Sequence, residues 1–301
     1  MRNFSNQNLL VLFLQSAAWI ICLEALHILD SFWAKSAVVV FFCLMMQGVF
    51  SLMHDCIHGL GHNRRQLNYV MGWWTGVMFG TPYSLFQVNH QGHHIRNRTP
   101  AEIAEYILPG ESRLRKTLVY YFAILGGIWF GSFLGLILFP FVPYSFVRFL
   151  NKPGTSMNGY SLSFKSFDML RWTRLRAECL TTIVIYGLLI RWLEWRLLEL
   201  AFAYVAFAFS WSSLQWVYHL RTPLDPIEGA YNLRSFTPVR WLFLNFNYNL
   251  THHRHPELHW QELHQRTNLR ETQPSWYRYL LVFRPPEPLP KDVGILEKKY
   301  F

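Results

Sequence analysis

Long apolar stretches constrain the fold of this chain more than any other feature of its sequence. Four of them, at about 9–29, 33–53, 179–195 and 197–218, approach the roughly 20 residues that a helix needs to cross a bilayer. The chain is 51% hydrophobic and 18% aromatic, and amphipathic aromatic rings are typical of membrane interfaces. The first stretch has a polar start and no small-residue cleavage pattern, which indicates a retained helix and not a removed signal peptide. The sequence therefore predicts an all-α integral membrane protein.

The four stretches form two pairs, each joined by a short polar link. The pair at about 9–53 turns around Asp30 and Ser31, and the pair at about 179–218 turns around Glu194 and Arg196. We therefore expect about four transmembrane helices in two hairpins. The runs at 69–88 and 117–146 are also apolar, but glycines and prolines interrupt them. For these runs we expect interfacial or re-entrant helices, or a short hairpin that crosses an even number of times.

Charge predicts which side of the membrane the remaining segments occupy. Six basic residues stand against Asp168 and Glu178 in the segment 148–178; they are Arg148, Lys152, Lys165, Arg171, Arg174 and Arg176. The positive-inside rule assigns such a segment to the cytoplasm. We therefore expect segments 54–178 and 219–301 to be cytoplasmic or interfacial, forming a histidine-rich cap on one domain that covers residues 1–301. Both termini are then cytoplasmic, and the active site lies on the cytoplasmic side.

Charge and cysteine content also narrow the function. The net charge of +10 suits contact with anionic lipid or with an acidic partner. Nucleic-acid binding is a poorer interpretation, because the basic residues flank apolar stretches and do not form a soluble patch. The four cysteines are scattered and contain no C-x-x-C pair, so the sequence indicates neither a disulfide framework nor a cysteine metal site.

Eight of the thirteen histidines gather in clusters that follow apolar segments. They are His54 and His58, then His90, His93 and His94, then the lone His219, and finally His252 and His253. Residues three or four apart share a helix face, and imidazole is a good ligand for iron, zinc and copper. A single histidine is more often a hydrogen-bonded core residue than a ligand. Together, however, the clusters exceed what one tetrahedral zinc would use, so we expect two metal ions.

The spacing of these clusters is also found in a known family. The three motifs are His54-Asp55-Cys56-Ile57-His58-Gly59, His90-Gln91-Gly92-His93-His94 and Asn249-Leu250-Thr251-His252-His253. From about Leu9 to Pro256 the chain resembles the membrane-bound fatty acid desaturase and hydroxylase superfamily. The resemblance implies a non-haem di-iron centre held by the eight histidines, with O2 as co-substrate. It also implies removal of hydrogen from an unactivated C–H bond, which needs transition-metal redox chemistry.

One position departs from the family pattern, in which the third motif is His-x-x-His-His. Asn249 stands at its first position, either as an additional or water-mediated metal ligand or as a helix cap. His62 and His255 are further candidates for the missing imidazole. We expect Asp55 and Gln215 to lie just behind the ligands. Asp55, Glu102, Glu105, Asp225 and Glu228 could accept the second N–H of a ligand histidine.

The membrane setting and the family both favour a lipid substrate, with an acyl chain in a tunnel lined by residues such as those of 41–49 and 69–88. Gly72, Gly76 and Gly80 could give room for the chain or allow close helix packing. We favour a fatty acyl desaturase that introduces a C=C bond. The alternatives are hydroxylation or ketolation of a carotenoid or alkane, and oxidative decarboxylation to a terminal alkene.

A metal-binding or transport protein without catalysis is a different hypothesis. Transport would require polar residues along the spans, which are almost free of them. An oxidase of this kind needs electrons, and the sequence shows no fused haem domain and no cysteine cluster for iron–sulfur. We therefore expect a separate donor such as a ferredoxin or rubredoxin, which would dock on the basic segments at 113–116 and 171–176.

Overall fold

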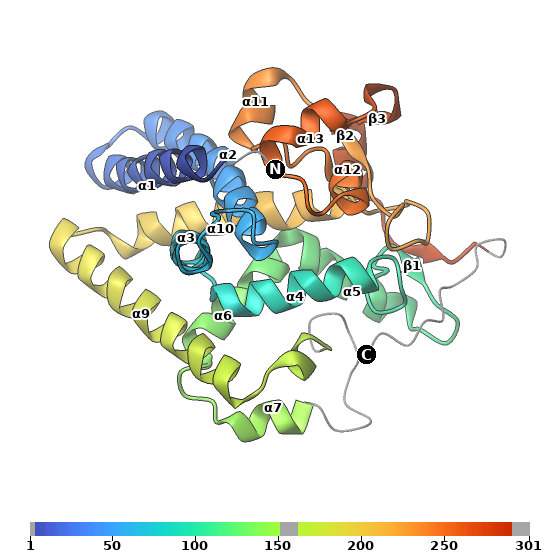
Figure 1. The fold of residues 1–301 in the computed structure, drawn as a ribbon, viewed down its shortest axis with the longest axis horizontal. Helices are drawn as coiled ribbons and strands as arrows, with labels where there is room; N and C mark the ends of the chain where they lie inside the picture. Colours follow the sequence, from blue (N-terminus) through green and yellow to red (C-terminus); the bar gives the residue numbers. More distant parts are fainter. Residues whose placement is uncertain (1–3, 151–161, 291–301) are drawn as a thin grey trace.

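The computed structural model describes residues 4–150 and 162–290, and helices dominate it (Figure 1). The long helices are α1 (Ser5–Ile28), α2 (Phe32–Ile57), α3 (Arg65–Phe79), α4 (Tyr83–Arg96), α9 (Met169–Leu193) and α10 (Leu197–Val217). The shorter ones are α5 (Arg113–Phe122), the π-helical turn η1 (Ala123–Gly127), α6 (Ile128–Leu138), α7 (Tyr144–Leu150), η2 (Phe164–Ser166), α11 (Thr237–Leu242), α12 (Asn249–Arg254), α13 (Trp260–Arg266), η3 (Leu269–Glu271) and α14 (Ser275–Leu281). Lys152 of the basic segment lies outside the described residues.

Two small parallel strand pairs complete the described structure. Strand β1 (Tyr106–Ile107) pairs with β4 (Glu287–Pro288), and β2 (Asn232–Arg234) pairs with β3 (Thr272–Pro274). Both pairs join segments that are distant in the sequence. They fasten the C-terminal part of the described chain to the polar segments that follow α4 and α10.

Within residues 4–150 and 162–290, four helical segments are long and apolar enough to cross a membrane: Ser5–Ile28, Phe32–Ile57, Arg113–Leu138 and Leu197–Val217. The predicted all-α membrane fold is therefore confirmed. Helices α1 and α2 lie side by side as the expected first hairpin (Figure 1). Ser31 stands between them, and its hydroxyl accepts a hydrogen bond from the backbone N–H of Ala34, which caps the start of α2.

The third candidate span is not the expected stretch 179–195. Helix α9 contains most of that stretch and ends at Leu193, but it also carries Arg174, Arg176 and Glu178, and charges are costly inside a bilayer. Helices α9 and α10 diverge from their short link, and α9 packs against α4 and α6 (Figure 1). The stretch Arg113–Leu138, for which we expected an even number of crossings, instead forms one helical run with the length and composition of a single span.

A bend divides this run at Gly126. The backbone φ of Gly126 is 122°, which side chains with a Cβ rarely adopt and which interrupts regular helix geometry. The π-helical turn Ala123–Gly127 therefore separates α5 from α6. The glycines that appear in the sequence as interruptions change the direction of one helical run and do not end it.

The glycines of α3 serve close packing. A Cβ atom added to Gly72 would lie 2.4 Å from the ring of Tyr83, and one added to Gly76 would lie 2.9 Å from the carbonyl oxygen of Thr81. The hydroxyl of Tyr83 donates a hydrogen bond to the carbonyl of Cys56 at 2.9 Å. Gly72 and Gly76 therefore allow close packing of the start of α4 against α3. They do not provide room for a substrate chain, which was the other alternative.

An aromatic cluster forms the core directly beneath the polar cap. The ring of Phe50 meets the rings of Trp211 and Phe246 at centroid distances of 5.3 and 5.1 Å in edge-to-face contacts. Phe246 also contacts the ring of His54, which lies one helical turn beyond Phe50. The packing of this cluster thus fixes the end of α2, where the first histidine motif stands.

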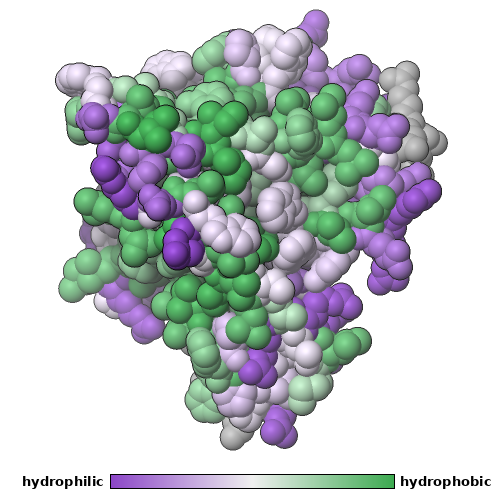
Figure 2. All heavy atoms as spheres, turned by 90° about the vertical axis from the view of Figure 1, so that its left-hand side faces the viewer, coloured by the Kyte–Doolittle hydropathy of each residue, from purple (hydrophilic) through white to green (hydrophobic). Residues whose placement is uncertain are grey.

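Much of the outer surface is apolar. Figure 2 shows the face on the left of Figure 1, where apolar side chains cover a large part of the surface. Exposed residues include Phe13 and Ile21 on α1 and Val184 and Trp192 on α9. Soluble monomers rarely expose continuous apolar areas of this kind, so the surface supports a membrane setting.

Asn8 connects α1 to two distant segments and provides a test of the fold. Its amide group is fully buried, donates to the carbonyls of Leu60 and Gly61, and accepts from the side chains of Trp260 and Gln261. We expect Asn8→Ala to destabilise the protein by roughly 1–3 kcal/mol, because buried partners lose their hydrogen bonds. The midpoint of thermal unfolding in detergent should fall. Asn6→Ala, at an exposed position of the same helix, is the control, and equal midpoints for both variants would contradict the assignment.

Candidate metal centre

The eight clustered histidines converge at one place in the fold and form two groups. The first group is His54, His58, His90, His94 and His252, and the second is His93, His219 and His253. Within each group the candidate ligand nitrogens all lie within 4.8 Å of one another. They come from the end of α2, from α4, from the residue that follows Tyr218 after α10, and from α12. The structure thus brings together all the histidines that the sequence pattern singled out.

Helix geometry explains how neighbouring histidines reach different groups. His90 and His94 are four residues apart on α4 and share one face, whereas His93 projects beside them. Similarly, His252 and His253 are adjacent on α12, so their side chains point about 100° apart. Helices α4 and α12 therefore contribute to both groups, which lie side by side.

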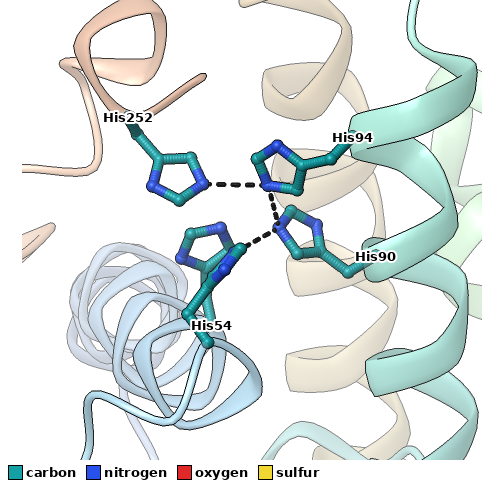
Figure 3. Close-up of side chains that lie close together, drawn as sticks. His54, His90, His94 and His252 are labelled. Carbon is teal, nitrogen blue, oxygen red and sulfur yellow. Dashed lines mark hydrogen bonds between the residues drawn. The ribbon is translucent and has the colours of Figure 1, made fainter. Parts of the chain in front are cut away.

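In the first group, the Nε2 atoms lie so close together that hydrogen bonds among them cannot account for every contact. The Nε2 atom of His90 lies 3.1 Å from that of His58 and 3.0 Å from that of His94. The Nε2 of His94 lies 3.1 Å from that of His252, and the rings point toward one another (Figure 3). A neutral imidazole Nε2 carries either one proton or one lone pair, so it can make one hydrogen bond. The three contacts run through four Nε2 atoms in a row, and at most two of them can therefore be hydrogen bonds. A bound cation would instead accept a lone pair from each of the four Nε2 atoms, so every one of them would have a partner.

In the second group, the Nδ1 atom of each histidine already has a partner. His93 contacts the Glu102 carboxylate at 2.6 Å. His219 donates to the carbonyl of Gly229 at 2.9 Å, and His253 donates to that of Pro226 at 3.2 Å. These partners leave Nε2 directed toward the other histidines, and the buried Nε2 of His253 has no hydrogen-bond partner among the described residues. Partners of this kind orient metal-ligating histidines in proteins.

Burial keeps the imidazoles neutral, which is the form that binds metal. It lowers the pKa of His58 to about 4 and that of His94 to about 2. The pKa values of His219 and His253 are also lowered, first by burial and then by repulsion from neighbouring imidazoles. At neutral pH these side chains therefore offer lone pairs without the need to lose a proton.

Asn249 is not a helix cap. It is the first residue of α12, whose cap position is Tyr248, and no side chain caps this helix. The Asn249 side chain is buried, and its Oδ1 has no hydrogen-bond partner among the described residues. It lines the same cavity as His93 and His219. These observations favour the other alternative, in which Asn249 faces a metal ion directly or through water.

The two further imidazole candidates lie apart from both groups. Helix α2 ends at Ile57, so His62 does not continue the helical face of His58, and its Nδ1 accepts a hydrogen bond from the backbone of Arg64. His255 is exposed and lies 3.4 Å from Glu257. Neither His62 nor His255 therefore adds a ninth imidazole to the two histidine groups in this structure.

Of the five acidic candidates, Glu102 contacts a clustered histidine, and the others have different partners. The Asp55 carboxylate accepts the backbone N–H of Trp260 and so joins α2 to α13. Glu105 pairs with the buried Arg98, and Glu228 pairs with Arg254. Asp225 accepts the N–H groups of Ile227 and Glu228 in its own turn. The partner that the structure gives Asp55 thus comes from α13, and a role for Asp55 in orienting a ligand stays a prediction.

A cavity of about 460 Å³ borders both histidine groups. Its polar end includes His90, His93, His219 and Asn249, together with Gln215, whose buried Nε2 has no hydrogen-bond partner among the described residues. Gln215 thus lines the same cavity as these histidines, and its role beside a metal ion stays a prediction. Asn89, Asn97 and Glu102 are further polar residues of the lining, and apolar residues form the remainder.

The cavity wall differs from the expected tunnel. None of its lining residues comes from 41–49, and Phe86 alone comes from 69–88. Six come from the bent run: Val119, Phe122, Ala123, Gly127, Ile128 and Gly131. Sequence reasoning missed this wall. The paired glycines at 126 and 127, with Gly131 one turn later, were the available signal.

The family model described as "Fatty acid desaturase" matches residues 31–285, which is most of the chain and includes all eight clustered histidines. No curated protein sequence matches the chain significantly.

Glu102 provides a test of the site. We expect Glu102→Gln to lower metal affinity roughly 10–100-fold, because the carboxylate orients His93 and strengthens its ring as a ligand. Metal retained by the purified protein during dialysis against a graded chelator series measures the effect. Glu111→Gln removes an exposed carboxylate that contacts Lys116 and is the matched control. Identical retention curves for the two variants would show that Glu102 has no role at the metal.

Proposed function

Because the chain belongs to the fatty acid desaturase family, we propose that it is an O2-dependent di-iron oxidase that introduces a C=C bond into a fatty acyl chain. The observation that supports this proposal most strongly is the position of the two histidine groups at the polar end of an apolar cavity. A chain in that cavity would have its C–H bonds next to the metal-binding nitrogens. Such a cavity also excludes water from the reacting part of the substrate.

The donor set is compatible with iron. Among the described residues both groups contain histidines alone, with no thiolate or carboxylate ligand. Imidazole is a common iron ligand, and the five histidines of the first group exceed the four ligands of a tetrahedral zinc site. One iron would be held by the first group and the other by His93, His219 and His253, with Asn249 nearby. Bound iron would supply the redox chemistry that activates dioxygen and removes hydrogen from an unactivated C–H bond.

The protein's own residues would position the substrate and hold water. Phe50, Phe86 and Trp211 form apolar walls close to the histidines and would hold an acyl chain by burial of its methylene groups. Gln215 and Asn249 contribute to the cavity a donor and an acceptor that have no partner in the part of the chain that the structure describes. Together they would bind a water molecule at the metal centre.

Reduction of the metal centre would require an outside electron donor. Arg113 and Arg115 are exposed at the start of α5, and Arg171 and Arg174 are exposed at the start of α9. A single crossing by Arg113–Leu138 would place Arg171 and Arg174 on the other side of the membrane. We infer that the acidic face of a small ferredoxin or rubredoxin binds at Arg113 and Arg115, because opposite charges steer such encounters. On the positive-inside rule, this surface and the active site would be cytoplasmic.

Product analysis tests the reaction. The protein, supplied with reduced ferredoxin, O2 and a saturated fatty acid, should yield an acyl chain that has lost two hydrogens, as measured by gas chromatography and mass spectrometry. A His93→Ala variant is the inactive control. A hydroxylated chain, a terminal alkene, or an oxidised carotenoid in a parallel incubation would instead establish one of the alternative oxidations. Metal flux into vesicles without any lipid product would favour transport.

Metal content tests the centre independently of activity. We expect about two iron ions per chain in the purified protein and a marked loss in His93→Ala, because the second group has only three histidines. Elemental analysis by mass spectrometry gives the stoichiometry. His255→Ala removes an exposed histidine outside both groups and should retain the parent's iron. One zinc per chain, or equal iron in His93→Ala, would refute the di-iron proposal.

A further inference from the structure

The outer side of the cavity is formed by one bent helical run. Six lining residues lie between positions 119 and 131, on α5, η1 and α6. Three of them are exposed on the outer surface of the protein: Val119 (58%), Phe122 (66%) and Gly131. Residues that line the cavity and also reach the surface mark an opening. We call this opening, defined by Val119, Phe122 and Gly131, the mouth.

Glycines contribute to the mouth. A Cβ atom built on Gly131 would meet no other atom within 4 Å, so the absence of a side chain leaves open space there. At Gly127, one turn earlier, a Cβ atom would lie 2.5 Å from the ring of Phe122. The glycine at 127 therefore lets the Phe122 ring lie against the helix, beside the opening. Larger side chains at these two positions would fill the mouth or displace the Phe122 ring.

The surface around the mouth is apolar. Leu118, Leu125 and Leu134 are 62%, 54% and 55% exposed on the same helical run. This run, Arg113–Leu138, has the length and composition of a membrane span. A mouth in its side therefore opens toward lipid acyl chains and not toward water. The same cavity is lined by His90, His93 and His219.

On the basis of the function proposed above, we infer that the substrate is an acyl chain already dissolved in the bilayer, which reaches the histidines sideways through the mouth. A thioester on a water-soluble carrier is thereby disfavoured as the direct substrate. The chain could belong to a free fatty acid or to a phospholipid. Both offer the same apolar chain to the mouth, and they differ only in the headgroup that stays outside.

Photochemical labelling tests this route without turnover. The metal-loaded protein in lipid nanodiscs is irradiated with a fatty acid that carries a diazirine in its chain, or with a phospholipid that carries the same chain. Labelled peptides are mapped by mass spectrometry. We expect label on residues that line the cavity, in α10 and α4 as well as on the bent run. The lipid form that gives this labelling identifies the source of the chain.

The decisive comparison uses two tryptophan variants of the same helix. Gly131→Trp should fill the mouth and lower cavity labelling several-fold. Leu138→Trp, at an exposed position two turns beyond Gly131 and outside the cavity, should leave labelling unchanged. Val119→Phe narrows the mouth at an exposed position and should lower labelling even if Gly131→Trp does not fold. Unchanged unfolding midpoints and iron contents confirm that the variants compared are intact.

The outcomes separate the access route from the reaction. Equal cavity labelling in the parent and in the folded mouth variants overturns the route, whatever product is formed. Labelling of the cavity by a water-soluble acyl thioester, unaffected by the mouth variants, overturns it as well. Labelling that depends on the mouth, without formation of any oxidised lipid, leaves the route standing and refutes the proposed function.

Discussion

Burial of neutral imidazoles is the constraint on which the rest of the structure depends. A buried polar ring is stable only when its nitrogens have partners. At His93, His219 and His253 the Nδ1 partners are a carboxylate and two backbone carbonyls. The segments that supply them must therefore lie against α4, the end of α10 and α12. The Nε2 atoms are left to face one another, which is unfavourable among protein atoms alone and favourable around cations.

The histidines stand where two different environments meet. Below them, Phe50, Trp211 and Phe246 form an aromatic cluster that holds the ends of α2 and α10 together. Above them, polar segments cover the site and are fastened to the helices by buried side chains such as Asn8. The cavity reaches the histidines from the apolar side. A lipid chain and a polar metal centre can thus adjoin without an aqueous gap between them.

The sequence predicted elements well where the signal was local. Histidines three or four residues apart share a helix face, so the composition of the site followed from spacing. Continuous apolar stretches likewise predicted α1, α2 and α10. Prediction failed for the third span, because Gly126 bends an apolar run that remains helical and because α9 is apolar over only part of its length. The position of Asp55 beside His54 in the chain did not indicate that its carboxylate accepts the backbone N–H of Trp260 on α13.

By itself, therefore, the sequence determined that the chain is helical, that it suits a membrane, and which eight histidines gather in one place. Those properties depend on composition and on short spacings along single helices. The tertiary structure alone decided how the histidines divide into groups of five and three, that Glu102 and not Asp55 contacts a ligand candidate, and that the bent run walls the cavity. Each of these features depends on contacts between residues far apart in the chain. The crossing of the helices and the direction of the side chains set those contacts, and no local sequence pattern encodes either.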